Sequence, residues 1–136
     1  MSNGSTPPSP GKQPSPAAPA PDSLLLSQQE IEKLQREHKG RVLILKITDQ
    51  DNTPCHLAFA YPSEPQYQRF MSDISMDSEG DVFYRTGKTL LADTLLHPGL
   101  NKFNELISLM PGLVPQITGL LQAKAQPALV EEIKNV

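Results

Sequence analysis

Proline is concentrated at one end of this chain, and that distribution limits how much of the chain can fold. Seven of the 14 prolines lie within the first 21 residues, and few side chains of that segment are charged or both large and apolar. A segment of this composition cannot bury enough apolar surface to offset the conformational entropy that ordering would cost. We therefore expect residues 1–23 to be a disordered Pro-rich tail, residues 24–125 to form a single domain, and residues 126–136 to fray.

The first predicted helix begins at a capping box. In Ser27-Gln28-Gln29-Glu30 the serine oxygen can accept a hydrogen bond from the third helical amide, while the glutamate side chain reaches back to the cap amide. Gly40 is placed to adopt the left-handed conformation that commonly ends a helix. These signals predict a helix over residues 28–39.

Two short segments with strand character follow this helix. Residues 41–48 are rich in β-branched side chains, residues 49–54 have the composition of a turn, and residues 55–61 alternate between apolar and other side chains. The pattern predicts an antiparallel hairpin. Because an isolated hairpin is only marginally stable in water, we expect it to pack against helices or to gain a further strand.

The rest of the chain has helical periodicity. Apolar side chains recur at three- and four-residue spacing in four segments, which predict helices over residues 64–75, 82–96, 100–110 and 113–125. Ser63, with Gln66 three residues later, offers a second serine cap for the first of these helices. Gly87 and Gly119 each weaken a helix, the second unless another backbone packs close to it. The predicted fold class is α+β: an N-terminal helix, a two-stranded antiparallel hairpin, and then a cluster of three to four helices.

Composition argues against several classes of function. The net charge is −3 with scattered basic residues, which disfavours binding to a nucleic acid backbone. A single cysteine, Cys55, cannot form an intrachain disulfide, so nothing indicates an oxidising compartment. No apolar run reaches the roughly 18 residues of a membrane span, and the N-terminus lacks the pattern of a secretory signal. We expect a cytoplasmic protein that binds neither nucleic acid nor membrane.

Motifs for bound ligands are incomplete. Gly87-Lys88-Thr89 resembles the end of a phosphate-binding loop, but Val82 occupies the position of the first glycine that such a loop needs. The acidic stretch from Asp73 to Asp81 resembles a calcium loop, but Ser78 replaces the glycine of the bend and Tyr84 replaces the bidentate glutamate. We predict no cofactor.

Residue pairs for catalysis or metal binding are also missing. Cys55 and His56 are neighbours in a strand, so their side chains point to opposite faces. His38 and His97 lack the spacing of a metal-binding pair, and Glu64 and Glu105 have no acidic partner. We predict that the protein is not an enzyme and has no catalytic, cofactor-binding or metal site.

Apolar helix surface is what the chain has in excess. The segment from Leu100 to Leu121 carries a large apolar side chain at nearly every second position, although these side chains can also bury one another as core. Surplus apolar surface on a small protein indicates self-association or a protein partner. The predicted partner-binding residues are Leu106, Ile107, Leu113, Val114, Ile117 and Leu120.

The order of these elements resembles that of the phage tail assembly chaperones, small cytoplasmic proteins of the tail gene module. The resemblance covers about residues 26–125 and is carried by Leu26-Ser27-Gln28-Gln29-Glu30, Lys33 to Gly40, the strand pair Val42–Ile47 and His56–Tyr61, Pro62 with the Tyr67–Ile74 helix, and the closing part from Leu106 to Leu121. It implies a chaperone that holds tape-measure and tail-tube components until assembly and is absent from the virion.

Two other interpretations remain open at this stage. The chain could be a structural virion component, such as a small tail or baseplate subunit, whose Pro-rich arm is ordered by neighbouring chains. It could also be a bacterial adaptor for a hydrophobic peptide, unconnected with phage. Oligomerisation fits any of the three interpretations.

Overall fold

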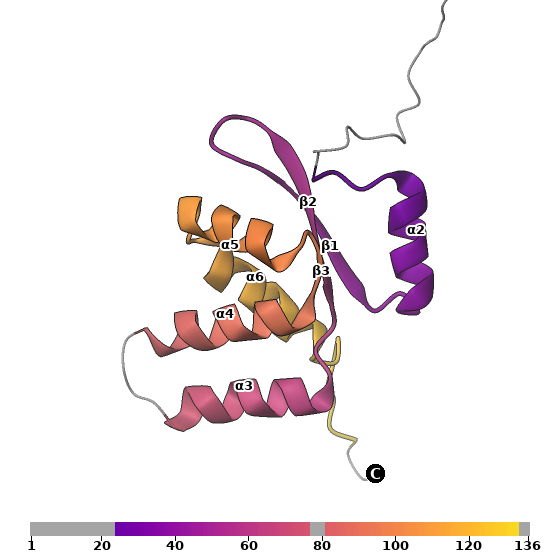
Figure 1. The fold of residues 1–136 in the computed structure, drawn as a ribbon. Coiled ribbons are helices and arrows are strands. Elements are labelled where there is room, and N and C mark those ends of the chain that lie inside the picture. The colour runs from indigo at the N-terminus through magenta and orange to yellow at the C-terminus, as the bar shows by residue number, and fades with distance from the viewer. Residues whose placement is uncertain (1–23, 77–80, 134–136) are drawn as a thin grey trace, which may run out of the picture.

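The computed structural model describes residues 24–76 and 81–133. The predicted tail at residues 1–23 lies outside the described residues, as do residues 77–80 of the acidic stretch. The helices and strands, labelled as in Figure 1, are α2 (Gln28–Glu37), β1 (Val42–Thr48), β2 (Pro54–Ala60), α3 (Glu64–Met76), α4 (Val82–Thr94), β3 (Leu95–His97), α5 (Leu100–Leu109) and α6 (Leu113–Lys124). The predicted α+β class is confirmed, and each predicted helix is present within one or two residues of its expected limits.

The strands form one antiparallel sheet in the order β1-β2-β3. The predicted hairpin is present, with Val42 opposite Ala60 and Ile47 opposite Cys55. The further strand is β3, which occupies residues that the sequence assigned to the end of a longer helix. The helix ends at Thr94, and residues 95–97 leave it to pair with the edge of β2, while Pro98 disfavours the helical conformation at His97 directly before it. The hairpin thus gains the third strand that it needs.

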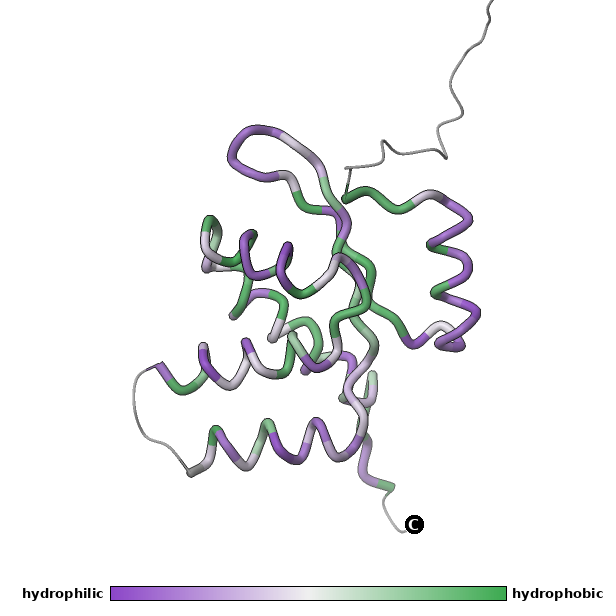
Figure 2. The backbone as a smooth tube through the Cα atoms, viewed as in Figure 1, coloured by the Kyte–Doolittle hydropathy of each residue, from purple (hydrophilic) through white to green (hydrophobic). Residues whose placement is uncertain are grey.

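The sheet separates the helices into two groups (Figure 1). On one face, Cys55, Leu57 and Phe59 of β2 join the core with buried side chains of α4, α5 and α6. On the other face lies α2, which packs against β1 and has no buried residue of its own. Figure 2 shows the same division: hydrophobic residues gather along the strands and the inner helices, while α2 is largely hydrophilic. The core therefore lies on one face of the sheet, and α2 covers the other face without contributing a buried residue.

Both predicted serine caps are formed. The Ser27 oxygen accepts from the Glu30 amide at 3.1 Å, and the Glu30 carboxylate accepts from the Ser27 amide at 2.8 Å. This last bond is the main reason why the pKa of Glu30 lies below its usual value. At α3, the amide of Ser63 donates to the Gln66 side chain at 2.9 Å. Gly40 has φ +78°, as expected for a residue that ends a helix.

We expect Ser27→Ala to destabilise α2 by about 1 kcal/mol, the usual cost of losing a helix N-cap. Because α2 buries no residue, the loss should be local. Hydrogen exchange of the α2 amides should accelerate while exchange in β1 and β2 stays unchanged. Ser27→Thr keeps a hydroxyl in the same place and is the control. Faster exchange throughout the sheet would show instead that α2 folds as one unit with the core.

Candidate protein-binding groove

The structure places five of the six predicted partner-binding residues in the core and one on the surface. The five, each less than a tenth exposed, are Leu106, Ile107, Leu113, Val114 and Ile117; Leu120 is 41% exposed. Helices α5 and α6 turn their richest apolar faces towards the sheet and α4, so most of the apolar surface that the sequence suggested as surplus is used within the domain. Contact of the five with a partner stays a prediction, and it requires α5 and α6 to move away from the sheet.

Other apolar side chains of the two helices do remain on the surface. Leu109, in the last turn of α5, is 63% exposed, and Leu100 begins the same helix with about half of its surface in contact with solvent. Beyond α6, the segment after Ala125 has no regular secondary structure and carries three largely exposed apolar residues: Leu129, Val130 and Ile133. Exposed apolar side chains thus lie at both ends of α5, at Leu120 of α6 and in the segment after α6.

Leu109 lies at the edge of a groove with a volume of about 450 Å³. The groove runs between α5 and the β1–β2 turn, which extends over this helix in Figure 1. Its apolar wall and floor consist of Leu24, Pro54, Cys55, Leu106 and Leu109, and its polar rim consists of Asp49, Thr53, Lys102 and Glu105. An apolar floor with a polar rim is the general composition of a protein-binding site.

The polar rim is held in place by local contacts. The Asp49 carboxylate accepts hydrogen bonds from the amides of Asp51 and Thr53 at 2.8 and 2.9 Å, which fixes the β1–β2 turn. On α5, the ammonium of Lys102 lies 3.2 Å from the Glu105 carboxylate. The charges of the rim are therefore already satisfied, and the unsatisfied surface of the groove is the apolar part.

Cys55 lies at the floor of the groove and is almost fully buried. Burial raises the pKa of its thiol, and the negative charge of Asp49 adds to the shift. A thiol of this kind is a weak nucleophile, because the reactive form is the thiolate. Its use is as a side chain of the apolar floor, and it offers a natural chemical probe of access to the groove.

The segment that precedes α2 also lines the groove, through Leu24. The carbonyl oxygen of Leu24 accepts from the His56 amide at 3.2 Å and lies 2.7 Å from Nε2 of His97. The Leu26 amide donates to Nδ1 of His56 at 2.8 Å. His56 and His97 are 41 positions apart in the sequence, and no sequence pattern predicted that they would lie close together. They do so because β3 pairs with β2.

The other residues that the sequence suggested for ligand or metal binding lie on separate elements. The Gly87-Lys88-Thr89 motif lies inside α4, where Gly87 faces Thr118 of α6. His38 caps the C-terminus of α2, and Asp81 pairs with Arg85 in the first turn of α4. Within residues 24–76 and 81–133, no group of three His, Cys, Asp or Glu side chains is arranged to hold a metal ion.

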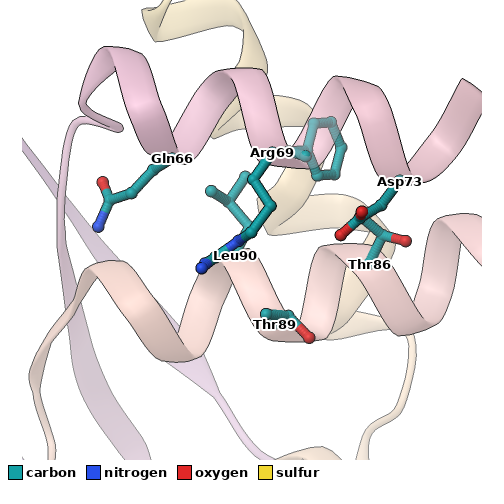
Figure 3. Close-up of a pocket in the computed structure, with 7 residues that line it drawn as sticks. Gln66, Arg69, Asp73, Thr86, Thr89 and Leu90 are labelled. Atoms are coloured by element: carbon teal, nitrogen blue, oxygen red, sulfur yellow. The ribbon is translucent and has the colours of Figure 1, made fainter.

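The hollow between α3 and α4 is too small for a ligand. Its volume of about 10 Å³ is at most that of one water molecule. Figure 3 shows how its lining residues fill the space: Gln66, Arg69 and Asp73 extend from α3 towards Thr86, Thr89 and Leu90 of α4. Arg69 also forms an ion pair with Asp93. These polar contacts join α3 to α4.

The described helices are shorter or less apolar than a membrane span. None has both the length and the hydropathy that crossing requires; α5 and α6 reach them only when taken together, across a bend of 119°.

Comparison with known proteins identifies the fold. No family model matches the chain, and no curated protein matches it. A solved structure of an uncharacterised protein, rbstp2171, from Bacillus stearothermophilus is similar to it, with a TM-score of 0.55 over 76% of this chain and 99% of that chain. The two sequences are 17% identical over this region, so the similarity is one of fold.

Proposed function

We propose that this protein is a non-enzymatic phage tail assembly chaperone that holds a tail-tube or tape-measure component through the groove beside α5. The exposure of Leu109 at the edge of an apolar groove is the observation that carries the proposal. The sequence resemblance over residues 26–125 supplies the identity of the partner. Support also comes from the helices and the hairpin, which follow one another in the order on which that resemblance depends.

The groove suits a partner segment that exposes one or two large apolar side chains. Burying apolar surface contributes about 25 cal/mol per Å², and contacts at the centre of an interface contribute most when a surrounding rim excludes water. Leu109 supplies a side chain that can enter the partner, and Leu106 and Cys55 supply a floor that can receive one. Because the rim carries both signs of charge, we expect binding that depends only weakly on salt.

The direct test is co-expression of the chain with the tail-tube and tape-measure proteins of the same phage, followed by a pull-down and a binding measurement. Recovery of either protein supports the proposal, and recovery of neither contradicts it. Mass spectrometry of purified particles separates the main alternative, because copies of the chain in finished virions would favour a structural tail or baseplate subunit.

We expect Leu109→Asp to weaken binding of that partner about tenfold or more, equivalent to ~1.4 kcal/mol, because a charge at the groove edge cannot be desolvated against an apolar segment. Ser108→Asp adds the same charge at the neighbouring exposed position and should bind normally. Isothermal titration calorimetry measures both. Equal affinity of Leu109→Asp and the unmodified chain would place the partner outside the groove, and Leu120→Asp would then test the exposed face of α6.

A further inference from the structure

The outer edge of β1 has no partner in the described part of the chain. In the order β1-β2-β3, β2 is central, and β1 and β3 form the two edges. On the β3 side, the edge of β2 is also covered by Leu24, whose carbonyl accepts from the His56 amide. On the other side, the seven residues of β1 have no further strand beside them within residues 24–76 and 81–133. An open edge of this length is a template for the addition of another strand.

The hydrogen bonds of the hairpin show which backbone groups of β1 point outwards. The Tyr61 amide donates to the Arg41 carbonyl at 3.1 Å, and the Asp49 amide donates to the Thr53 carbonyl at 3.0 Å. Bonded and non-bonded pairs alternate along an antiparallel ladder, so the odd-numbered residues of β1 bond to β2. The even-numbered residues direct their amides and carbonyls to the open edge, where they form no hydrogen bond with another described residue. These residues are Val42, Ile44, Lys46 and Thr48.

The side chains of β1 are mostly apolar and only partly buried. Leu43, Leu45 and Ile47 pack against the core cluster, yet each keeps part of its surface exposed. On the other face Ile44 is also partly exposed, and Lys46 carries the only charge within the strand. A lysine on an edge strand opposes indiscriminate pairing. A strand that pairs here must therefore cover apolar surface without placing a positive charge opposite Lys46.

The charges that flank β1 have opposite signs, which points to a second copy of this chain as the added strand. Arg41 precedes the strand and Asp49 follows it, both on the face of Leu45. Arg41 lies over the Tyr61 ring, 5.3 Å from its centroid, and the Asp49 carboxylate accepts from the Thr53 amide. When two copies run antiparallel with Leu45 opposite Leu45, each Arg41 lies opposite Asp49 of the second copy. Parallel pairing would align like charges instead.

The same register satisfies the open backbone groups and keeps the lysines from lying opposite each other. With Leu45 on the twofold axis, Val42 lies opposite Thr48 of the second copy, and Ile44 lies opposite Lys46. Every outward-facing residue then meets another and can exchange both backbone hydrogen bonds with it. An axis at Lys46 would oppose two lysines, which is destabilising, and an axis at Ile44 would leave Thr48 without a strand residue opposite it.

We propose that two copies of this chain associate through β1, antiparallel and with Leu45 on the twofold axis, so that their sheets join into one continuous sheet. The contact uses the same strand of both copies, which makes it closed and limits the assembly to a dimer. The inference goes beyond the proposed function and does not depend on it, since no tail component takes part in the contact.

The first test is sedimentation velocity of the full chain from low micromolar to several hundred micromolar, where we expect a monomer–dimer equilibrium. Ile44→Lys and Ile44→Glu form a matched pair, because both replace the same apolar side chain by a charged one. The first sets a positive charge opposite Lys46 of the second copy, and the other sets a negative charge there. The dimer dissociation constant should be at least about tenfold higher for Ile44→Lys than for Ile44→Glu. A chain that stays monomeric, or equal constants for the two variants, would overturn the proposal.

Disulfide cross-linking tests the register independently of these charges. In a Cys55→Ala background, Leu45→Cys places a thiol opposite its own counterpart at a non-hydrogen-bonded pair, where the Cα atoms are about 4.5 Å apart and within reach of a disulfide. Leu43→Cys lies on the same face and is the control, because it faces Ile47 of the second copy and is far from its own counterpart. We expect linked dimers from Leu45→Cys and few from Leu43→Cys. No cross-linking of Leu45→Cys, or as much from Leu43→Cys, contradicts this register.

Discussion

Phe59→Ala should lower the free energy of unfolding by about 3–5 kcal/mol, the largest effect expected of any single substitution considered for this protein. Phe59 lies in the central strand β2 and has no exposed surface. Its ring meets that of Phe103 from α5 edge-on, with centroids 5.6 Å apart and planes inclined at 72°. Truncation would leave a cavity between the sheet and the helices, bounded by hydrogen-bonded strands on one side. Urea unfolding followed by far-ultraviolet circular dichroism measures the loss.

The second edge-to-face pair of the molecule provides a matched control. Phe70 and Phe83 join α3 to α4 with centroids 6.2 Å apart, but Phe83 is only partly buried. Phe83→Ala should therefore cost clearly less than Phe59→Ala. If Phe59→Ala does not fold, Phe59→Leu keeps most of the volume and should still unfold at lower urea than the unmodified chain. A larger loss in Phe83→Ala would place the main stabilising contact between α3 and α4.

The features that sequence reasoning predicted well are those fixed by neighbouring residues. The caps at Ser27 and Ser63 depend on groups three positions away, and the hairpin depends on a turn whose Asp49 bonds to amides within four residues. Such contacts form in almost any surroundings. Local composition was therefore enough to predict the helices, the first two strands and the α+β class.

The features that sequence reasoning missed depend on contacts between distant segments. Residues 95–97 form a strand only because the edge of β2 is available for pairing, and their leucines alone fit the end of a helix equally well. The burial of Ile107 and Val114 depends on how α5 and α6 pack against the sheet, which periodicity does not specify. The groove and the hydrogen bonds of His56 and His97 to residues 24 and 26 share this origin, since each is assembled from segments far apart in the chain.

The close contact between α4 and α6 is another contact between distant segments that the sequence did not predict, and it depends on a single residue. The sequence predicted that both Gly87 and Gly119 weaken a helix, and it suggested a close approach of another backbone at Gly119 only. In the structure, a Cβ atom built on Gly87 would lie 2.5 Å from Oγ1 and 3.2 Å from Cγ2 of Thr118, whereas a Cβ atom on Gly119 would meet nothing within 4 Å. Only Gly87 is required by packing, because it allows α6 to approach the backbone of α4.

Alanine substitutions at these two glycines should therefore have opposite effects. Gly87→Ala must displace Thr118, which is fully buried, and overpacking of this kind costs about 1–3 kcal/mol. Gly119→Ala places a methyl group in open space and should stabilise α6 by up to about 1 kcal/mol, the difference in helix propensity between the two residues. Urea unfolding of both variants measures the two shifts, and a stabilising Gly87→Ala would contradict the close approach.

The double variant Gly87→Ala with Thr118→Ala tests whether the cost arises from this one contact. Thr118 Oγ1 is buried without a hydrogen-bond partner among the described residues, so its removal forfeits no hydrogen bond and opens space for the new methyl group. We expect the double variant to be more stable than the sum of the two single changes predicts, with a coupling energy of about 1 kcal/mol or more. If the effects of the two single changes on the unfolding free energy simply add, α4 accommodates the new methyl group by shifting elsewhere along its length. The two helices would then contact each other mainly through their leucines and not at this glycine.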